Sequence, residues 1–171
     1  MGAVNTTMND QHYHSSKLWK IGFFALNNTA TNFYLFAMGF VAYYATGIAG
    51  LTVVIVSTIL TAMRLFDGVT DPIIGFVIDK TESKFGKFRP LMILGNIILA
   101  GSVIIMYSVT HLLPTNLQLL FFIFIYAIHI IGYTLQTAVT KAAQTVLTNH
   151  PKQRPLFSIF DATYNVGLFT G

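Results

Sequence analysis

Two carboxylates and a guanidinium, Asp67, Asp71 and Arg64, interrupt a long apolar run of the sequence. On a helix that advances about 100° per residue, these positions fall within about 60° of one another and form a polar stripe. An ionised side chain at membrane depth costs at least about 2.5 kcal/mol, so we expect both carboxylates to face the interior of a helix bundle. Neighbouring carboxylates suit a hard monovalent cation or a proton. The alternative is that Arg64 and Asp67 only pair along the helix and stabilise it.

Amide and hydroxyl side chains form similar stripes in two further apolar runs. The side chains that we expect to contact a solute are Asn28, Thr31, Asn32, Gln136, Thr137 and Lys141. A polyhydroxylated solute such as a sugar needs donors and acceptors of this kind once it loses water. The same side chains also hold membrane helices together, and Lys141 lies near enough to a helix end to extend its amine to the interface. Solute lining and interhelical contact therefore both remain open.

The composition indicates which elements must position these side chains. Of the 171 residues, 54% are hydrophobic and 9% are charged, whereas soluble domains carry about 25% charged residues. The mean hydropathy of +0.63 excludes disorder and predicts an integral membrane protein. The absence of cysteine excludes disulfides and cysteine zinc sites, and the five histidines are too scattered to suggest a metal site. Apart from a site for a coupling sodium ion or proton, we expect no metal site, no cofactor and no nucleic-acid partner.

The apolar runs predict an all-α membrane protein with four complete transmembrane helices and an incomplete fifth. The predicted spans are about 21–46, 51–78, 91–110, 117–146 and 155–171, after a cytoplasmic tail at 1–20. Each of the first four reaches the roughly 20 residues that cross a bilayer. The fifth run stops without a polar flank, so we expect the chain to be truncated.

Lysine and arginine gather on one side of the predicted spans. They are Lys17 and Lys20 before the first span, Lys80, Lys84, Lys87 and Arg89 between the second and third, and Lys152 and Arg154 after the fourth. Cytoplasmic loops carry such an excess. We therefore expect a multi-pass protein of the cell membrane with a cytoplasmic N-terminus.

The segment 67–90 carries a long ordered motif, D-x-x-x-D-P-x-x-G-x-x-x-D-K-T-x-S-K-x-G-K-F-R-P. It closely resembles the signature of the glycoside-pentoside-hexuronide:cation symporters, the melibiose and lactose permease-like branch of the major facilitator superfamily. The resemblance implies the N-terminal half of a major-facilitator bundle. It also implies a secondary active transporter, not an enzyme, that carries a glycoside or other sugar together with sodium or a proton by alternating access.

The resemblance further implies roles for single residues. Asp67 and Asp71 match the family's cation-site carboxylates, and Thr134 matches a hydroxyl near that site on the fourth helix. Thr31 and Thr137 stand where the melibiose permease branch has acidic sugar contacts. Two further departures are Lys141, which replaces an aromatic residue, and Asp161, which lies near the place of an arginine. The cation half of the site thus matches the family, while the identity of the sugar stays open.

The loop 79–90 and the second span supply candidate gating residues. These are Arg64, Asp79, Lys80, Lys84, Lys87 and Arg89. The resemblance implies that the loop cations bridge to acidic groups of the second half when the cytoplasmic side closes. The alternative is that they only set the topology of the chain.

Other functions compete with sugar symport. A relative that moves a lipid-like or other polar solute is one, and an inactive truncated remnant is another. An intramembrane enzyme would use His129 with Asp67 or Asp71, but the sequence shows no nucleophile, metal set or cofactor motif for it. Because alternating access requires two halves, we expect the 171 residues to need the missing C-terminal six helices for transport.

Overall fold

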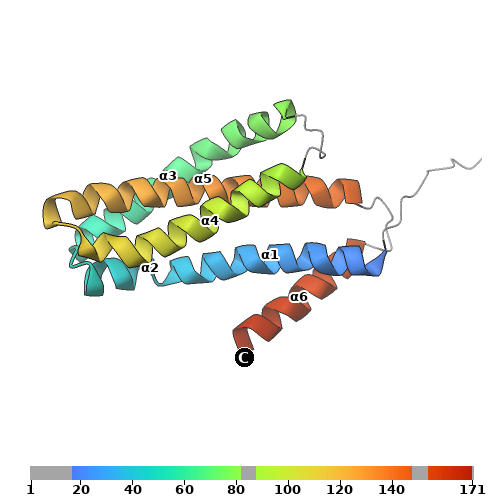
Figure 1. Ribbon diagram of the computed structural model, residues 1–171, viewed down its shortest axis with the longest axis horizontal. Helices are drawn as coiled ribbons and strands as arrows, with labels where there is room; N and C mark the ends of the chain where they lie inside the picture. Colours follow the sequence, from blue (N-terminus) through green and yellow to red (C-terminus); the bar gives the residue numbers. More distant parts are fainter. Residues whose placement is uncertain (1–16, 82–87, 148–153, 171) are drawn as a thin grey trace, which may run out of the picture.

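The computed structural model describes residues 17–81, 88–147 and 154–170, and the regular structure within these ranges is helical. The long helices are α1 (Leu18–Gly39), α3 (Val53–Lys80), α4 (Arg89–Val109), α5 (Thr115–Leu147) and α6 (Arg154–Thr170). Three short segments complete the order: α2 (Val41–Tyr43), a π-helical turn at Tyr44–Ile48 and a 3₁₀ turn at Thr110–Leu112. Figure 1 shows α1, α4 and α5 running side by side, with α3 crossing behind α5 and α6 diverging from α1. The all-helical fold class is as predicted.

Three of the described helical segments are long and apolar enough to cross a membrane: Val53–Lys80, Arg89–Leu112 and Thr115–Val146. They correspond to the second, third and fourth predicted spans. The asparagines of α1 lower its mean hydropathy, and α6 has only 17 residues. Length and composition thus support three spans among the described helices, and α1 and α6 do not meet the same criteria.

The first predicted span is not one continuous helix. It begins earlier than expected, at Leu18, and α1 ends at Gly39 before α2 and the π-helical turn continue the chain. Gly50 then adopts a φ of +72°, which strongly favours glycine, and the backbone turns there into α3. Leu51 donates a backbone hydrogen bond to the Ala45 carbonyl over 2.9 Å and closes this turn.

Helix α5 packs against both α4 and α3, while α1 packs mainly against α6. The contact between α4 and α5 depends on glycine. A Cβ atom on Gly95 would lie 2.7 Å from Gln136 Oε1, and one on Gly132 would lie 2.6 Å from Ile98 Cγ2. Small residues of this kind let membrane helices approach closely. They bring the polar side chains of α5 within reach of the other helices.

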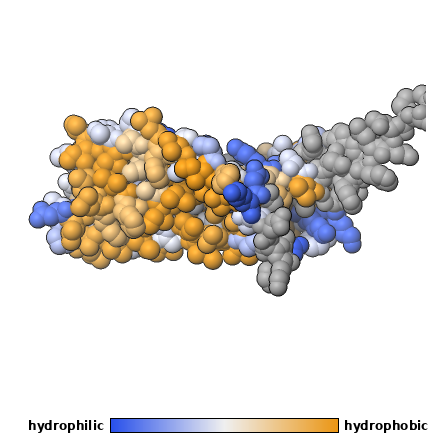
Figure 2. Space-filling model, turned by 90° about the horizontal axis from the view of Figure 1, so that it is seen from above, coloured by the Kyte–Doolittle hydropathy of each residue, from blue (hydrophilic) through white to orange (hydrophobic). Residues whose placement is uncertain are grey.

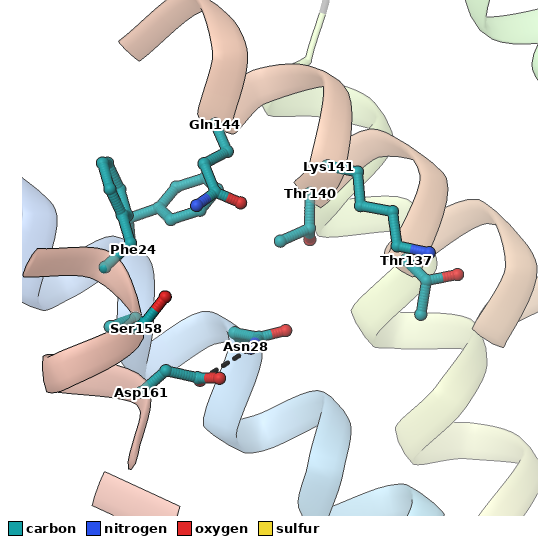
Figure 3. A pocket seen from close by; sticks show the side chains of 10 residues that line it. Phe24, Asn28, Thr137, Thr140, Lys141, Gln144, Ser158 and Asp161 are labelled. Atoms are coloured by element: carbon teal, nitrogen blue, oxygen red, sulfur yellow. Dashed lines mark hydrogen bonds between the residues drawn. The ribbon is translucent and has the colours of Figure 1, made fainter. Parts of the chain in front are cut away.

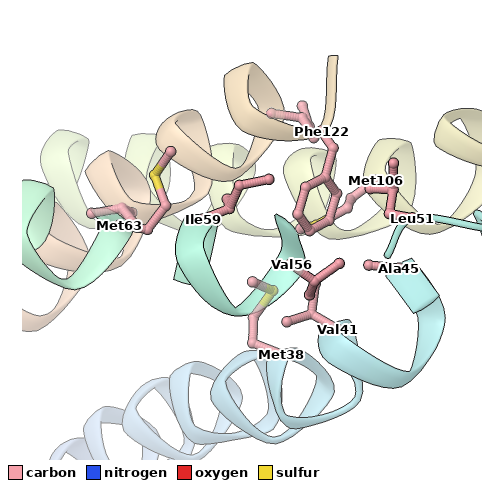
Figure 4. Packing of buried hydrophobic residues seen from close by; sticks show 11 residues of the cluster. Met38, Val41, Ala45, Leu51, Val56, Ile59, Met63, Met106 and Phe122 are labelled. Carbon is pink, nitrogen blue, oxygen red and sulfur yellow. The ribbon is translucent and has the colours of Figure 1, made fainter. Parts of the chain in front are cut away.

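Apolar side chains fill the end of the bundle that holds α2 and the start of α3. Figure 4 shows Phe122 of α5 and Met106 of α4 beside Val56 and Ile59 of α3. A second cluster joins α3, α4 and α5 through buried side chains of Ile74, Ile78, Leu91, Leu135 and Val139. Apolar side chains also cover much of the face shown in Figure 2. Apolar side chains are thus both inside and outside, as expected where lipid is the solvent.

Candidate functional site

Asp67 of α3 and Thr134 of α5 join the two helices. The Thr134 hydroxyl donates a hydrogen bond to Asp67 Oδ1 over 2.9 Å, and Thr134 is only 1% exposed. The Thr70 hydroxyl donates to the Asp67 backbone carbonyl over 2.9 Å and lies 3.5 Å from the Thr134 hydroxyl oxygen. Because both hydroxyl protons are used, the two threonine oxygens keep free lone pairs beside a carboxylate. Sodium prefers such oxygen ligands.

The predicted polar stripe of α3 lies at the edge of its buried face. The buried positions of this helix are Val56, Ile59, Met63, Thr70, Ile74 and Ile78. At about 100° per residue, Asp67 lies about 30° from the centre of that face, Asp71 about 70° and Arg64 about 90°. Asp67 is half-buried, whereas Asp71 and Arg64 are exposed. Asp67 therefore lies toward the interior of these helices, as expected, whereas Asp71 is exposed among them and its inward position stays a prediction.

Arg64 and Asp67 open onto a cavity of about 150 Å³ between α1, α3 and α5. Among the described residues no ion pair joins Arg64 to Asp67, so the pairing interpretation of the stripe does not fit. His129 also lines this cavity, and its Nδ1 lies 3.0 Å from Ser102 Oγ, which itself donates to the Leu99 carbonyl. His129 is thus a hydrogen-bonded packing residue between α4 and α5.

A second cavity, of about 250 Å³, lies between α1, α5 and α6. It brings together three of the predicted solute contacts, Asn28, Thr137 and Lys141, and adds Asp161 of α6. Asn28 Nδ2 donates to Asp161 Oδ1 over 2.6 Å. Figure 3 shows Asn28 and Asp161 on one wall and Thr137 and Lys141 on the other. Amide, hydroxyl and charged groups around one cavity can hold a polyhydroxylated solute.

The α1/α5/α6 cavity also has apolar walls. Phe24 and Phe157 line it, and their rings meet edge to face with centroids 5.6 Å apart. Aromatic rings beside polar groups let a cavity contact both the ring face and the hydroxyls of a sugar.

The other predicted solute contacts of the fourth and first spans serve packing. Gln136 is fully buried, and its Nε2 donates to Asn27 Oδ1 over 2.9 Å. Asn96 Nδ2 donates to the same oxygen over 2.8 Å, which ties α1, α4 and α5 together. Thr31 is buried and its hydroxyl donates to the Asn27 carbonyl of its own helix. The interpretation of these stripes as interhelical contacts therefore fits Gln136. Neither Gln136 nor Thr31 lines the α1/α5/α6 cavity.

Asn32 connects α1 to α6, since its Nδ2 donates to Asn165 Oδ1 over 3.1 Å. It does not line the α1/α5/α6 cavity. Together with the bond from Asn28 to Asp161, this contact makes α6 a polar partner of α1. Of the predicted polar stripe of the first span, Asn28 thus lines the cavity, whereas Thr31 and Asn32 make packing contacts.

The candidate gating residues of the 79–90 loop lie near one end of the bundle where the structure describes them, whereas Arg64 lies in the middle of α3. Asp79 and Lys80 end α3, and Arg89 begins α4. Lys80 Nζ lies over the Phe76 ring at 4.4 Å from its centroid. Lys84 and Lys87 fall outside the described residues. The gating role of these cations stays a prediction.

Sequence reasoning missed several polar contacts of the site. Thr70 is next to Asp71 in sequence, but its role depends on the packing of α3 against Thr134 of α5. Asn96 is the one polar side chain in the apolar segment 91–100, and an intramembrane amide is the signal that marks it. Asp161 was noted only as a departure from the resembled family, and its contact with Asn28 joins residues far apart in the chain.

A sequence model described as MFS/sugar transport protein matches residues 18–169 of the chain. The chain belongs to this family. The resemblance predicted from the motif at 67–90 is therefore confirmed at family level. Three of its described helices are long and apolar enough to cross a membrane, so this chain is a multi-pass membrane protein of a sugar-transport family.

Several curated proteins are similar to this member of the MFS/sugar transport family. The putative glycoside/cation symporter YagG of Escherichia coli (strain K12) is 32% identical over 136 residues, which are 79% of this chain and 29% of the relative. The inner membrane symporter YicJ of the same organism is 30% identical over 117 residues, 68% of this chain and 25% of the relative. A lactose permease of Lactobacillus helveticus is 24% identical over 120 residues, 68% of this chain and 18% of the relative. The chain thus spans less than a third of each relative's length.

Proposed function

We propose that this protein carries a sugar or glycoside across the cell membrane together with sodium or a proton, by alternating access. The hydrogen bond from Thr134 to Asp67 carries this proposal, because it places a carboxylate and free hydroxyl lone pairs at one point between two helices. The printed names of the relatives, a glycoside/cation symporter and a lactose permease, support the class of solute. A sugar-sized polar cavity lies on the other side of the same helix.

Helix α5 connects the two sites in the proposed mechanism. Thr134 contacts Asp67, and Thr137, one turn later, lines the α1/α5/α6 cavity. A cation bound at Asp67 neutralises its charge and fixes the position of Thr134, and with it the wall that carries Thr137. If the cation favours sugar binding in this way, the sugar must favour cation binding by the same factor. Asp71 would supply a second carboxylate when the exposed face of α3 is covered.

The proposed topology places the N-terminus and the 79–90 loop in the cytoplasm. Figure 1 shows α1 beginning, α3 ending and α4 beginning at one end of the bundle, where the cationic segments lie. In this arrangement α1 and α6 also cross the membrane, because their polar side chains face each other rather than lipid. Closure of the cytoplasmic side would bring the loop cations against acidic groups of a second set of helices.

The helices described here supply one wall of the proposed transport pathway. The relatives are more than three times as long as the region they share with this chain. In transporters built of two halves, the solute lies between them near the middle of the membrane. The exposed Asp71, Arg64 and Lys141 are the side chains that a second half would cover.

The test is gradient-driven uptake by the protein that carries this sequence, reconstituted in vesicles. We expect saturable accumulation of a radiolabelled glycoside under an inward sodium or proton gradient, and none when the gradient is dissipated. Gradients of each ion alone identify the coupling ion. Accumulation of a fluorescent lysolipid instead of the glycoside would favour the lipid-like solute, and no uptake of either in a correctly inserted protein would favour an inactive remnant.

A further inference from the structure

Thr140 of α5 is a buried threonine whose hydroxyl keeps an unused proton. Its side chain lines the α1/α5/α6 cavity, and only 6% of the residue is exposed. Asn27 Nδ2 donates to the Thr140 hydroxyl oxygen over 3.3 Å. Thr137, one turn earlier, donates its own hydroxyl proton to the Tyr133 carbonyl, but no acceptor for the Thr140 proton lies among the described residues. Thr140 therefore offers a hydrogen-bond donor to the cavity.

A cluster of three amide side chains holds Thr140 in this arrangement. Asn27 Oδ1 accepts from Asn96 Nδ2 over 2.8 Å and from Gln136 Nε2 over 2.9 Å. Because both lone pairs of this oxygen are occupied, the Asn27 side chain cannot turn over without losing two bonds, and its Nδ2 stays directed at Thr140. Gln136 fits here because Gly95 has no Cβ, which would lie 2.7 Å from Gln136 Oε1.

Asn28 of α1 offers a matching acceptor. Its Nδ2 donates to Asp161 Oδ1 over 2.6 Å, a short bond of the kind made to an ionised carboxylate. This bond leaves the Asn28 Oδ1 atom directed away from Asp161, and the part of the chain that the structure describes supplies no donor to it. Figure 3 shows Thr140 and Asn28 facing the same space from α5 and α1. A free donor and a free acceptor thus meet at one point of the cavity.

We propose that Thr140 and Asn28 together bind one hydroxyl group of the solute and so determine which sugars the protein accepts. The inference rests on the proposed function and names specificity-determining residues of that site. The solute hydroxyl accepts from Thr140 and donates to Asn28 Oδ1. An ether oxygen could not donate to Asn28, and an ammonium group could not accept from Thr140. A sugar without this hydroxyl leaves a buried donor and an acceptor unpaired, which costs affinity.

The experiment removes the solute hydroxyl and the protein groups separately. The competitors of uptake are nitrophenyl galactoside, nitrophenyl glucoside and each monodeoxy derivative of both. In wild-type protein we expect at least one derivative to bind about tenfold or more weakly than its parent, because a buried donor is left unpaired. Thr140→Val, which has a similar shape, should bind this derivative and its parent within about twofold of each other, because the interaction is already lost. Thr140→Ser should keep the wild-type ratio.

Asn28→Ala is the second variant, and it should remove the discrimination at the same sugar position because the hydroxyl then has no acceptor. A purely structural role for either residue would instead weaken parent and derivative equally. Thr163→Val on α6 is the matched control, since it removes an exposed hydroxyl that bonds to the Ile159 carbonyl. It should leave every ratio between parent and derivative unchanged.

Three results would overturn the inference. They are uptake that neither parent glycoside inhibits, wild-type protein that binds every derivative as tightly as its parent, and either Thr140→Val or Asn28→Ala with all the wild-type ratios. Gradient-driven uptake of a glycoside would then still support sugar symport. The loss of all gradient-driven sugar uptake in wild-type protein would instead refute the proposed function itself.

Discussion

Helix α5 has two polar faces, one toward α3 and one toward α1 and α6. They differ in how many of their polar side chains are bonded to other residues of the chain. Toward α3, Thr134 is buried and donates to Asp67, and Thr70 completes the contact with Asp67. Toward α1 and α6, Lys141 is exposed beside an open cavity. The first face is preorganised by bonds within the chain, while on the second no described residue pairs with the charge of Lys141. Such a division suits a transporter in which the cation site is built first and the solute completes the other site.

The substitution with the largest expected effect is Asp67→Asn. The amide oxygen still accepts the Thr134 hydrogen bond, so the helices should pack as before, but the charge that attracts the cation is gone. We expect cation affinity to fall by about a hundredfold or more, beyond the loss typical of residues that only support a ligand. The measurement is the cation concentration that gives half-maximal sugar uptake.

Asp71→Asn tests whether the cation site includes a second carboxylate, because Asp71 is exposed in the described helices. If a second half covers it, this variant should also lose cation dependence, while membrane insertion stays normal by protease accessibility. Equal cation affinity in Asp71→Asn and wild-type protein would restrict the site to Asp67, Thr70 and Thr134.

Gly95→Ala tests whether both faces of α5 depend on its close contact with α4. The added Cβ would lie 2.7 Å from Gln136 Oε1 and 3.3 Å from the Gln136 Cα atom, so the backbone must shift. We expect a loss of about 2 kcal/mol in stability, typical of overpacking. Thermal unfolding in detergent measures it.

Gly101→Ala is the control for this prediction, since a Cβ there has no neighbour within 4 Å and the residue lies on the same helix. It should be neutral or slightly stabilising, because alanine favours helix more than glycine. Equal unfolding temperatures for Gly95→Ala and Gly101→Ala would show that α4 and α5 do not approach closely at Gly95.

Thr134→Val separates the hydroxyl from the shape of the side chain. The loss of one oxygen ligand and of the bond to Asp67 should lower cation affinity by about tenfold, as removal of a hydrogen bond to a charged group does. Thr134→Ser should retain most of the affinity. Thr145→Val, on the same helix, removes an exposed hydroxyl that bonds only to the Ala142 carbonyl, and it should change nothing.

Asn32→Ala has the smallest expected effect. It removes the bond to Asn165, a half-buried contact between α1 and α6. Contacts of this type contribute about 0.6 kcal/mol in membrane proteins, so stability should fall slightly and sugar affinity should not change. A large loss of sugar affinity would instead place Asn32 in the solute site.

The helices and the inward position of Asp67 are the parts that the sequence predicts well. Apolar runs and polar flanks locate α3, α4 and α5 within a few residues, and intramembrane carboxylates are costly enough to mark Asp67. The rotation of each helix is what the sequence does not specify. Because of the rotation of α5, Gln136 faces Asn27 instead of the α1/α5/α6 cavity. Because of the rotation of α3, Asp71 lies outside the buried face of that helix.

The coupling of sugar affinity to the cation tests the central claim, that Asp67 and Thr134 form a cation site linked to a sugar site on α5. Isothermal titration of the purified protein with its sugar, at rising sodium concentration and at falling pH, measures it directly. In wild-type protein the sugar dissociation constant should fall as one of these ions rises, and in Asp67→Asn it should be independent of both. A dissociation constant in Asp67→Asn that still falls with the ion as in wild-type protein would contradict the account.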